Sequence, residues 1–189
     1  KNYMILFVGL GNPTPDSENN RHNVGFKIID SINKKFSLSK QKPKFKGLLT
    51  TGNVGDQKVY AIKPLTFMNN SGICIRELIE YFKIDAEDVI VFHDDLDVEF
   101  GKIKAKFGGS SAGHNGITSI DKFIGKDYSR VRIGIGKPKE KMEVGDFVLQ
   151  NFDEDEILGI EKISNNINEF ISILVEKKLD LFSSTVNNR

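Results

Sequence analysis

Residues 4–13, Met-Ile-Leu-Phe-Val-Gly-Leu-Gly-Asn-Pro, decide the fold class. The run from Met4 to Leu10 is continuously apolar, as in a strand that is buried on both faces. The Gly-Asn-Pro sequence that follows ends this strand. After a polar loop, the spacing predicts a helix from about His22, with one apolar face formed by Val24, Ile28, Ile29, Ile32 and Phe36. A buried strand followed by an amphipathic helix is the repeating unit of α/β folds.

The rest of the chain repeats this alternation. Further strands are predicted at residues 47–54, 58–63, 89–92, 102–107 and 130–135. Helices are predicted to begin at residues 69–71, to carry Ile117, Ile120 and Ile124, and to run from the Asp153/Glu156 capping box to Leu174. We expect the polar tail at residues 183–189 to be frayed.

Without repeats or a long linker, we expect one domain over residues 1–189. We expect a three-layer α/β/α sandwich around a mixed, mostly parallel twisted sheet.

Composition narrows the class of protein. Of 189 residues, 39% are hydrophobic and 28% are charged, and the net charge is only +1, so nucleic-acid binding needs a local basic patch. The single cysteine, Cys74, excludes an internal disulfide and fits a reducing compartment. We expect no membrane span, no signal peptide at residues 1–4 and a cytoplasmic location.

Polar residues follow several predicted strands at the point where each strand ends. In open α/β sheets, ligands bind outside the carboxyl ends of the strands. If these strands run the same way, one edge of the sheet gathers Asn12, His22, Asn69, Asp94, His114 and Asn115.

A histidine and an aspartate at such an edge form a general base with an orienting carboxylate. No G-x-S-x-G elbow supplies a nucleophile, so water would attack. Asparagine amides carry both donor and acceptor groups, which suits them to hold a peptide or to stabilise an oxyanion.

Structural interpretations of the same residues stay open at this point. A lone histidine after a strand is more often a cap or a surface residue, and Asp94 and Asp95 suit a solvated strand end. Asn69-Asn70-Ser71 is a helix-start signal. Gly9 and Gly11 resemble a dinucleotide fingerprint, but Thr14 stands where its third glycine belongs.

Two basic rows are candidate phosphate contacts. The period of two places Lys102, Lys104 and Lys106 on one face of their strand, and Arg130 and Arg132 on one face of theirs. An ordinary solvated face, or an edge strand protected by lysines, explains these rows equally well. The lysine-rich segment at residues 34–46 is a further RNA-facing candidate, although a solvated helix end and loop fits it better.

Five ordered blocks resemble the signature of bacterial peptidyl-tRNA hydrolases. They span nearly the whole chain, at residues 9–13 with 21–25, 66–72, 93–97, 108–116 and 130–136. The resemblance implies an enzyme that cuts the ester between peptide and tRNA and so recycles tRNA from stalled or aborted translation. It also implies no metal, no cofactor and a monomer.

The resemblance also implies residue roles. His22 would be the base that activates water, and Asp94 would orient it. Asn12, Asn69 and Asn115 would bind the peptide and the tRNA 3′ end, and Met68 would line the peptide groove. The tRNA contacts would be Lys104, Lys106 and Arg132 on phosphate, with His114 near the acceptor stem.

The chain departs from the pattern in its first loop. Thr14 stands where the family usually has Gly, Ser17 where it usually has Tyr, and Asn20 where Thr is common. Because that Tyr borders the site in relatives, the substrate-side wall is expected to differ here.

Two other functions compete with the hydrolase. The first is a non-catalytic RNA-binding protein on the same scaffold, which turnover would exclude. The second is an enzyme acting on small substrates, such as a nucleotide-dependent enzyme or a peptidase. The incomplete glycine fingerprint and the lack of an H-E-x-x-H motif argue against the second.

Overall fold

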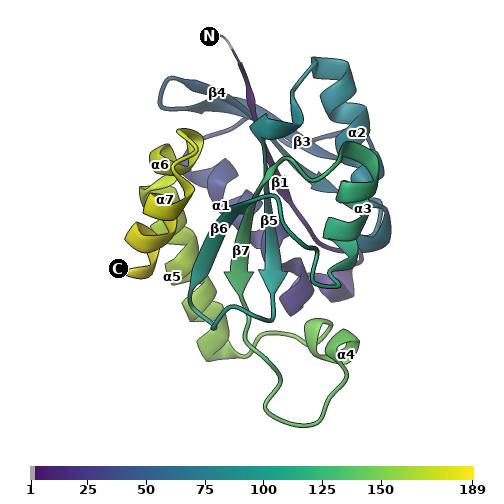
Figure 1. The fold of residues 1–189 in the computed structure, drawn as a ribbon, viewed down its shortest axis with the longest axis vertical. Helices are drawn as coiled ribbons and strands as arrows, with labels where there is room; N and C mark the ends of the chain where they lie inside the picture. The colour runs from purple at the N-terminus through teal and green to yellow at the C-terminus, as the bar shows by residue number, and fades with distance from the viewer. Residues whose placement is uncertain (1–2) are drawn as a thin grey trace.

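The computed structural model describes residues 3–189 and contains one seven-stranded sheet (Figure 1). The expectation about a signal peptide rests partly on Lys1 and Asn2, which lie outside the described residues. In chain order the strands are β1 (Ile5–Gly9), β2 (Lys42–Lys44), β3 (Gly47–Val54), β4 (Gln57–Pro64), β5 (Val89–Asp95), β6 (Ile103–Phe107) and β7 (Ser129–Gly134).

The sheet has the strand order β2-β3-β4-β1-β5-β7-β6. The four central strands, β4, β1, β5 and β7, pair in parallel, whereas β3 and β6 run against their neighbours. The predicted mixed α/β sheet is therefore confirmed. Strand β6 runs antiparallel to β7, not in the same direction as the expectation assumed. Phe107 therefore lies at the amino-terminal edge of the parallel strands. The loop after Phe107 must cross back to the carboxyl-terminal edge, where His114 and Asn115 were expected.

Helices cover both faces of the sheet. On one face lie α2 (Ser71–Phe82) and α3 (Asn115–Ile124), and the other is covered by α1 (Val24–Lys35), α5 (Glu154–Glu169), α6 (Ile171–Val175) and α7 (Leu179–Asn187) (Figure 1). Strand β1 alternates between the two cores: Ile5 and Phe7 face α1, and Leu6 and Val8 face α2. The short helix α4 (Val144–Val148) lies beyond the carboxyl ends of β5 and β7.

Two predictions for the C-terminal region were wrong. The long helix expected to reach Leu174 ends at Glu169, and α6 begins two residues later. The tail expected to fray forms α7, which buries Phe182 and Val186. Its Asn187 side chain accepts from the backbone N of Ile103 (2.9 Å) and donates to the Ile103 carbonyl (2.8 Å), so it satisfies the outer edge of β6 as a neighbouring strand would.

Glycines bring α1 unusually close to the sheet. A side chain on Gly9 would come within 2.2 Å of the Gly25 carbonyl oxygen, and one on Gly25 within 2.4 Å of the Phe92 carbonyl oxygen. Only glycine permits this approach. The packing explains the glycines that resembled a dinucleotide fingerprint, and it sets His22, just before α1, over the end of β5.

Within the described residues, none of the helices combines the length and the apolar character that a membrane crossing requires.

Candidate active site

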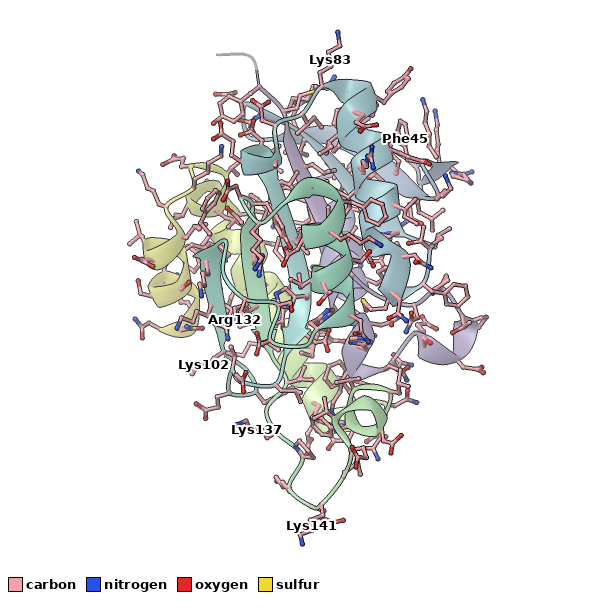
Figure 2. All side chains as sticks on the ribbon, turned by 45° about the vertical axis from the view of Figure 1, so that its right-hand side comes forward. Phe45, Lys83, Lys102, Arg132, Lys137 and Lys141 are labelled. Atoms are coloured by element: carbon pink, nitrogen blue, oxygen red, sulfur yellow. The ribbon has the colours of Figure 1, made fainter. Side chains whose placement is uncertain are left out.

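The site lies at the carboxyl ends of β5 and β7, where a cavity of about 620 Å³ opens. His22 and Asp94 form one part of its wall, and His114 and Asn115 form another. The loop after β7 and helix α4 complete it, through residues that include Lys137, Pro138 and Val144. Figure 2 shows Lys137 and Lys141 on that loop.

Asp94 holds two imidazoles. Its Oδ2 lies 2.8 Å from Nδ1 of His22, and its Oδ1 lies 2.8 Å from Nε2 of His114. The Asp94 side chain is only 3% exposed. Burial by itself would raise the pKa of Asp94, but the charges and hydrogen bonds of His114 and His22 outweigh burial and hold that pKa well below its usual range. Asp94 is therefore a carboxylate at neutral pH.

The hydrogen bonds fix the protons on both rings. The Asp94 carboxylate only accepts, so His22 carries its proton on Nδ1, and its Nε2 has a free lone pair. His114 is the N-cap of α3, and its Nδ1 accepts from the backbone N–H groups of Gly116 (3.1 Å) and Ile117 (3.3 Å). Its proton is therefore on Nε2, and no polar atom of this ring is left for RNA.

The turn that carries His22 is anchored by its neighbours. Arg21 donates to Glu156 (3.1 Å) and to the Phe147 carbonyl (3.2 Å), with its guanidinium 4.2 Å from the centre of the Phe147 ring. Asn23, buried, donates to the Asn12 carbonyl and accepts from the Asn12 backbone N, both at 2.9 Å. Sequence reasoning assigned no role to Arg21 and Asn23, although both lie in the block around His22.

The three candidate asparagines are in different situations. Asn115 is exposed and lines the cavity. The side-chain oxygen of Asn12 accepts a hydrogen bond from the backbone N–H of Met68 (2.9 Å). This bond joins the loop after β1 to the segment after β4. Asn69 is exposed beside Met68 but is not among the residues that line the cavity. Met68 is only 4% exposed, so most of its side chain packs inside the protein.

The basic rows divide into two kinds. Because β6 and β7 pair as Lys104 with Arg132 and Lys106 with Arg130, all four side chains lie on one face. Lys104 and Lys106 are exposed, and no salt bridge engages them within residues 3–189. Arg132 pairs with Asp95 (2.7 Å), which lines the cavity. Figure 2 shows Arg132 near Lys102 at this side of the molecule.

Arg130 does not belong to a phosphate-binding row. It is 2% exposed, bonds Asp121 (2.9 Å) and donates to the Ser110 carbonyl (3.0 Å). It therefore ties the glycine-serine loop to α3. Phe45, from the lysine-rich segment, lies at the opposite end of the molecule from Lys137, so this segment is not part of the cavity (Figure 2).

The residues of the first loop that depart from the family pattern contact each other. Ser17 is buried, and its Oγ lies 2.6 Å from Oγ1 of Thr14. Ser17 therefore contributes to closing the first loop.

His22, Asp94 and His114 also lie close enough together to suggest a metal site. The hydrogen bonds do not fit one. Since Nδ1 of His114 faces two N–H donors, Nε2 must hold the proton of the neutral ring, and a protonated nitrogen cannot bind a metal. A second acidic group, Asp85, Glu87 and Asp88, lies elsewhere, and its Asp88 pairs with Lys177.

Similarity to known proteins agrees with this geometry. The sequence model of the family described as peptidyl-tRNA hydrolase matches residues 6–189. A peptidyl-tRNA hydrolase of Pelagibacter ubique is 81% identical over 98% of this chain and all of its own, and one of Bacillus subtilis is 46% identical over 84% and 85%. The crystal structure of peptidyl-tRNA hydrolase from Acinetobacter baumannii superimposes with a TM-score of 0.90 at 32% identity, covering 97% of this chain and 94% of that one. The chain belongs to the peptidyl-tRNA hydrolase family.

Proposed function

We propose that His22 is the general base with which this enzyme hydrolyses peptidyl-tRNA, and that Asp94 orients it. The observation that carries the proposal is the 2.8 Å hydrogen bond from Nδ1 of His22 to Asp94, which leaves Nε2 free at the cavity. An oriented imidazole with a free lone pair takes a proton from water, and the nearby carboxylate stabilises the resulting cation.

The reaction has two stages. In the first, Nε2 of His22 takes a proton from water while the water oxygen bonds to the ester carbonyl carbon, giving a tetrahedral oxyanion. In the second, the bond from that carbon to the ribose oxygen breaks, and the leaving oxygen takes the proton from the imidazolium. The products are a peptide carboxylic acid and a tRNA with a free 3′-terminal ribose, and the histidine returns to its starting form.

Asparagine amides would hold the substrate. Asn115 offers its amide directly to the cavity, where it suits the oxyanion or the peptide. We assign Asn12, Asn69 and Met68 to the peptide and the tRNA 3′ end, with Asn12 acting partly through its bond to the Met68 backbone. A site built for a peptide bond should process an aminoacyl-tRNA with a free amine poorly, because its amides would be left unpaired.

The tRNA phosphates would bind to basic side chains beside the cavity. Lys104 and Lys106 present exposed ammonium groups suited to phosphate, and Arg132 links them to the cavity through Asp95. We assign His114 to Asp94 and not to the acceptor stem, because both of its ring nitrogens are engaged inside the protein. We favour the enzyme over the non-catalytic alternative, because the curated relatives are named peptidyl-tRNA hydrolases and because His22 is hydrogen-bonded to Asp94 as a general base would be.

We further propose that the enzyme acts as a monomer in the cytoplasm. The one cysteine, Cys74, is buried and free, which fits a reducing compartment. Sedimentation at assay concentration tests the first point, and a dimer that supplies a residue to the cavity would contradict it.

The decisive experiment is release of the peptide from an N-blocked aminoacyl-tRNA. His22→Ala should lower kcat by about 10²- to 10⁴-fold, the usual contribution of a general base. Free imidazole should restore part of the rate, because the variant leaves a space where the base was. Lys162→Ala, an exposed change on α5, is the control and should behave as wild type. Full activity in the His22 variant would refute the proposal.

A further inference from the structure

The three histidines of the chain form one contact series. Ring centres of His22 and His114 lie 4.9 Å apart, and those of His114 and His93 lie 5.0 Å apart. Asp94 bonds to all three: its carboxylate bonds to His22 and His114, and its backbone carbonyl lies 2.8 Å from Nδ1 of His93. The mechanism above uses His22 and His114 but gives His93 no role.

The proton of His93 is also fixed by its partner. A carbonyl oxygen only accepts, so the proton is on Nδ1 and Nε2 is a bare acceptor. The ring is 4% exposed, and Nε2 finds no hydrogen-bond partner within residues 3–189. Burial, followed by the nearby His114, lowers the pKa of His93 to about 3, so the ring is neutral at the pH of translation.

This arrangement is poor for stability. A buried acceptor without a partner lowers stability, whereas a phenyl ring of similar size would bring no such atom into the core. Burial of apolar surface therefore does not explain why an imidazole occupies this position. Residues that lower stability in this way are characteristic of functional sites.

The imidazole makes two contacts that a purely apolar side chain would not make together. Its Nδ1–H holds the carbonyl of Asp94, the residue whose carboxylate orients the base. Its ring meets the His114 ring edge to face, at an interplanar angle of 71°, and so supports the ring whose Nε2–H holds the second oxygen of that carboxylate. His93 thus reaches the Asp94–His22 pair in two ways: through the main-chain carbonyl of Asp94 and through the ring of His114.

We propose that His93 is a positioning residue for catalysis, which fixes the Asp94 carboxylate against His22 through the Asp94 carbonyl and the His114 ring. This inference rests on the proposed function of His22. It makes His93 a residue that favours rate at the expense of stability.

Other charged groups also lie around this series of histidines. Besides Asp94 and His114 they are Asp95 on β5, Arg132 on β7, Arg21 beside His22 and Lys137 in the loop that closes the cavity. None of these is altered by a substitution at His93, so the same background applies to each variant.

The test compares His93→Phe, which keeps a ring without the donor, with His93→Asn, which keeps an N–H near the position of Nδ1 without the ring. For each, kcat and KM for N-blocked aminoacyl-tRNA are measured against pH, together with the thermal midpoint. Ile90→Val, a buried change earlier on β5, is the matched control. His22→Ala is run alongside to show whether the base itself has been correctly assigned.

His93→Phe should fold with an unchanged or higher thermal midpoint. Its kcat should fall by about tenfold to a hundredfold, as for a catalytic group displaced by a fraction of an ångström, with KM unchanged. The acidic limb of its kcat/KM profile should move to lower pH, because a misplaced Asp94 stabilises the His22 cation less. His93→Asn should retain more of the rate than His93→Phe, and Ile90→Val should keep the wild-type profile.

Two results would overturn the inference. If His93→Phe shows the wild-type rate and pH profile while His22→Ala is inactive, His93 has no part in positioning and the proposed function stands. If His93→Phe does not fold, or loses rate only in proportion to a loss of folded protein, His93 is a structural residue. An active His22→Ala would instead contradict the proposed function itself.

Discussion

The cavity around Asp94 and the basic face of β6 and β7 are both rich in charge, yet they are organised in opposite ways. Asp94 is buried, His22 and His114 are partly buried, and each of these two rings has a proton fixed by a hydrogen bond. On the basic face, Lys104 and Lys106 extend into solvent without a salt bridge in the described part of the chain. Arg130, on the same face, is buried and paired.

The difference fits the roles proposed for the two regions. Proton transfer needs its groups held in one geometry before substrate arrives, because small displacements reduce the rate strongly. Phosphate attraction acts over the Debye length and tolerates mobile ammonium groups. Charge alone therefore does not distinguish the two proposed roles. The presence or absence of hydrogen-bond and salt-bridge partners within the protein does.

The largest effect should come from disrupting the fixed region at its centre. Asp94→Asn should lower kcat by about 10³- to 10⁴-fold, as for the corresponding change in a serine protease triad. An amide donates to His22 Nδ1 and so favours the tautomer with the proton on Nε2, which cannot act as the base. Measured kcat against Asp97→Asn, a carboxylate change in the same cavity, checks this. A rate for Asp94→Asn within threefold of that control would contradict the comparison.

A substitution of Arg130 tests whether this buried residue differs in its effect on stability from the exposed lysines on the same face. Arg130→Ala should lower the free energy of unfolding by about 3 kcal/mol or more, because Asp121 loses its buried partner. Lys104→Ala on the same face should leave stability within about 0.5 kcal/mol of wild type. Urea unfolding of both variants measures this. Equal stabilities would mean that Arg130 belongs with the lysines.

The exposed lysines should affect affinity alone. Lys104→Ala with Lys106→Ala should weaken tRNA binding by about tenfold to a hundredfold at low salt and reduce the salt slope by about 2, one unit for each phosphate contact. The kcat at saturating substrate should not change. Binding titrations over a salt series measure the slope, and an unaltered slope would place the phosphate contacts elsewhere.

The smallest effect is a pH dependence of stability. His93 has a pKa of about 3 when folded and 6.5 when exposed, so below pH 6.5 the unfolded chain binds a proton that the folded chain does not. This group should therefore lower the free energy of unfolding as the pH falls from 6.5 towards 3. In His93→Phe that contribution is absent, so its unfolding free energy should decline less steeply than that of wild type. Parallel slopes would show that His93 is not buried as a neutral ring.

Local patterns were sufficient to predict the strands at residues 4–10 and 47–54 and the helix after His22, because periodicity and turn residues fix them. Long-range partners determined the rest. The helix predicted through Leu174 breaks at Phe170, and the tail became α7 because Ser183 and Asn187 bond to the edge of β6. The partners of Asn187 lie 84 residues away in the chain, so no local pattern reveals them.

The sequence predicted some of the residues that line the cavity, but not the hydrogen bonds that connect them. Signature blocks identified His22, Asp94 and Asn115, which the structure gathers at one cavity. They also named His114, but the cap that its Nδ1 forms on α3 and the bond from its Nε2 to Asp94 depend on the tertiary fold. Arg130 and Arg132 look alike in sequence, and only the packing of Asp121 and Ser110 around Arg130 distinguishes them.

The most direct test of the central claim is nitrogen NMR of the imidazole rings at a pH where the rate has reached its plateau. Three histidines make the spectrum assignable by single substitutions. We predict a proton on Nδ1 of His22 with Nε2 bare, and a proton on Nε2 of His114. A His22 ring that carries its proton on Nε2, or that exchanges freely between the two forms, would contradict it.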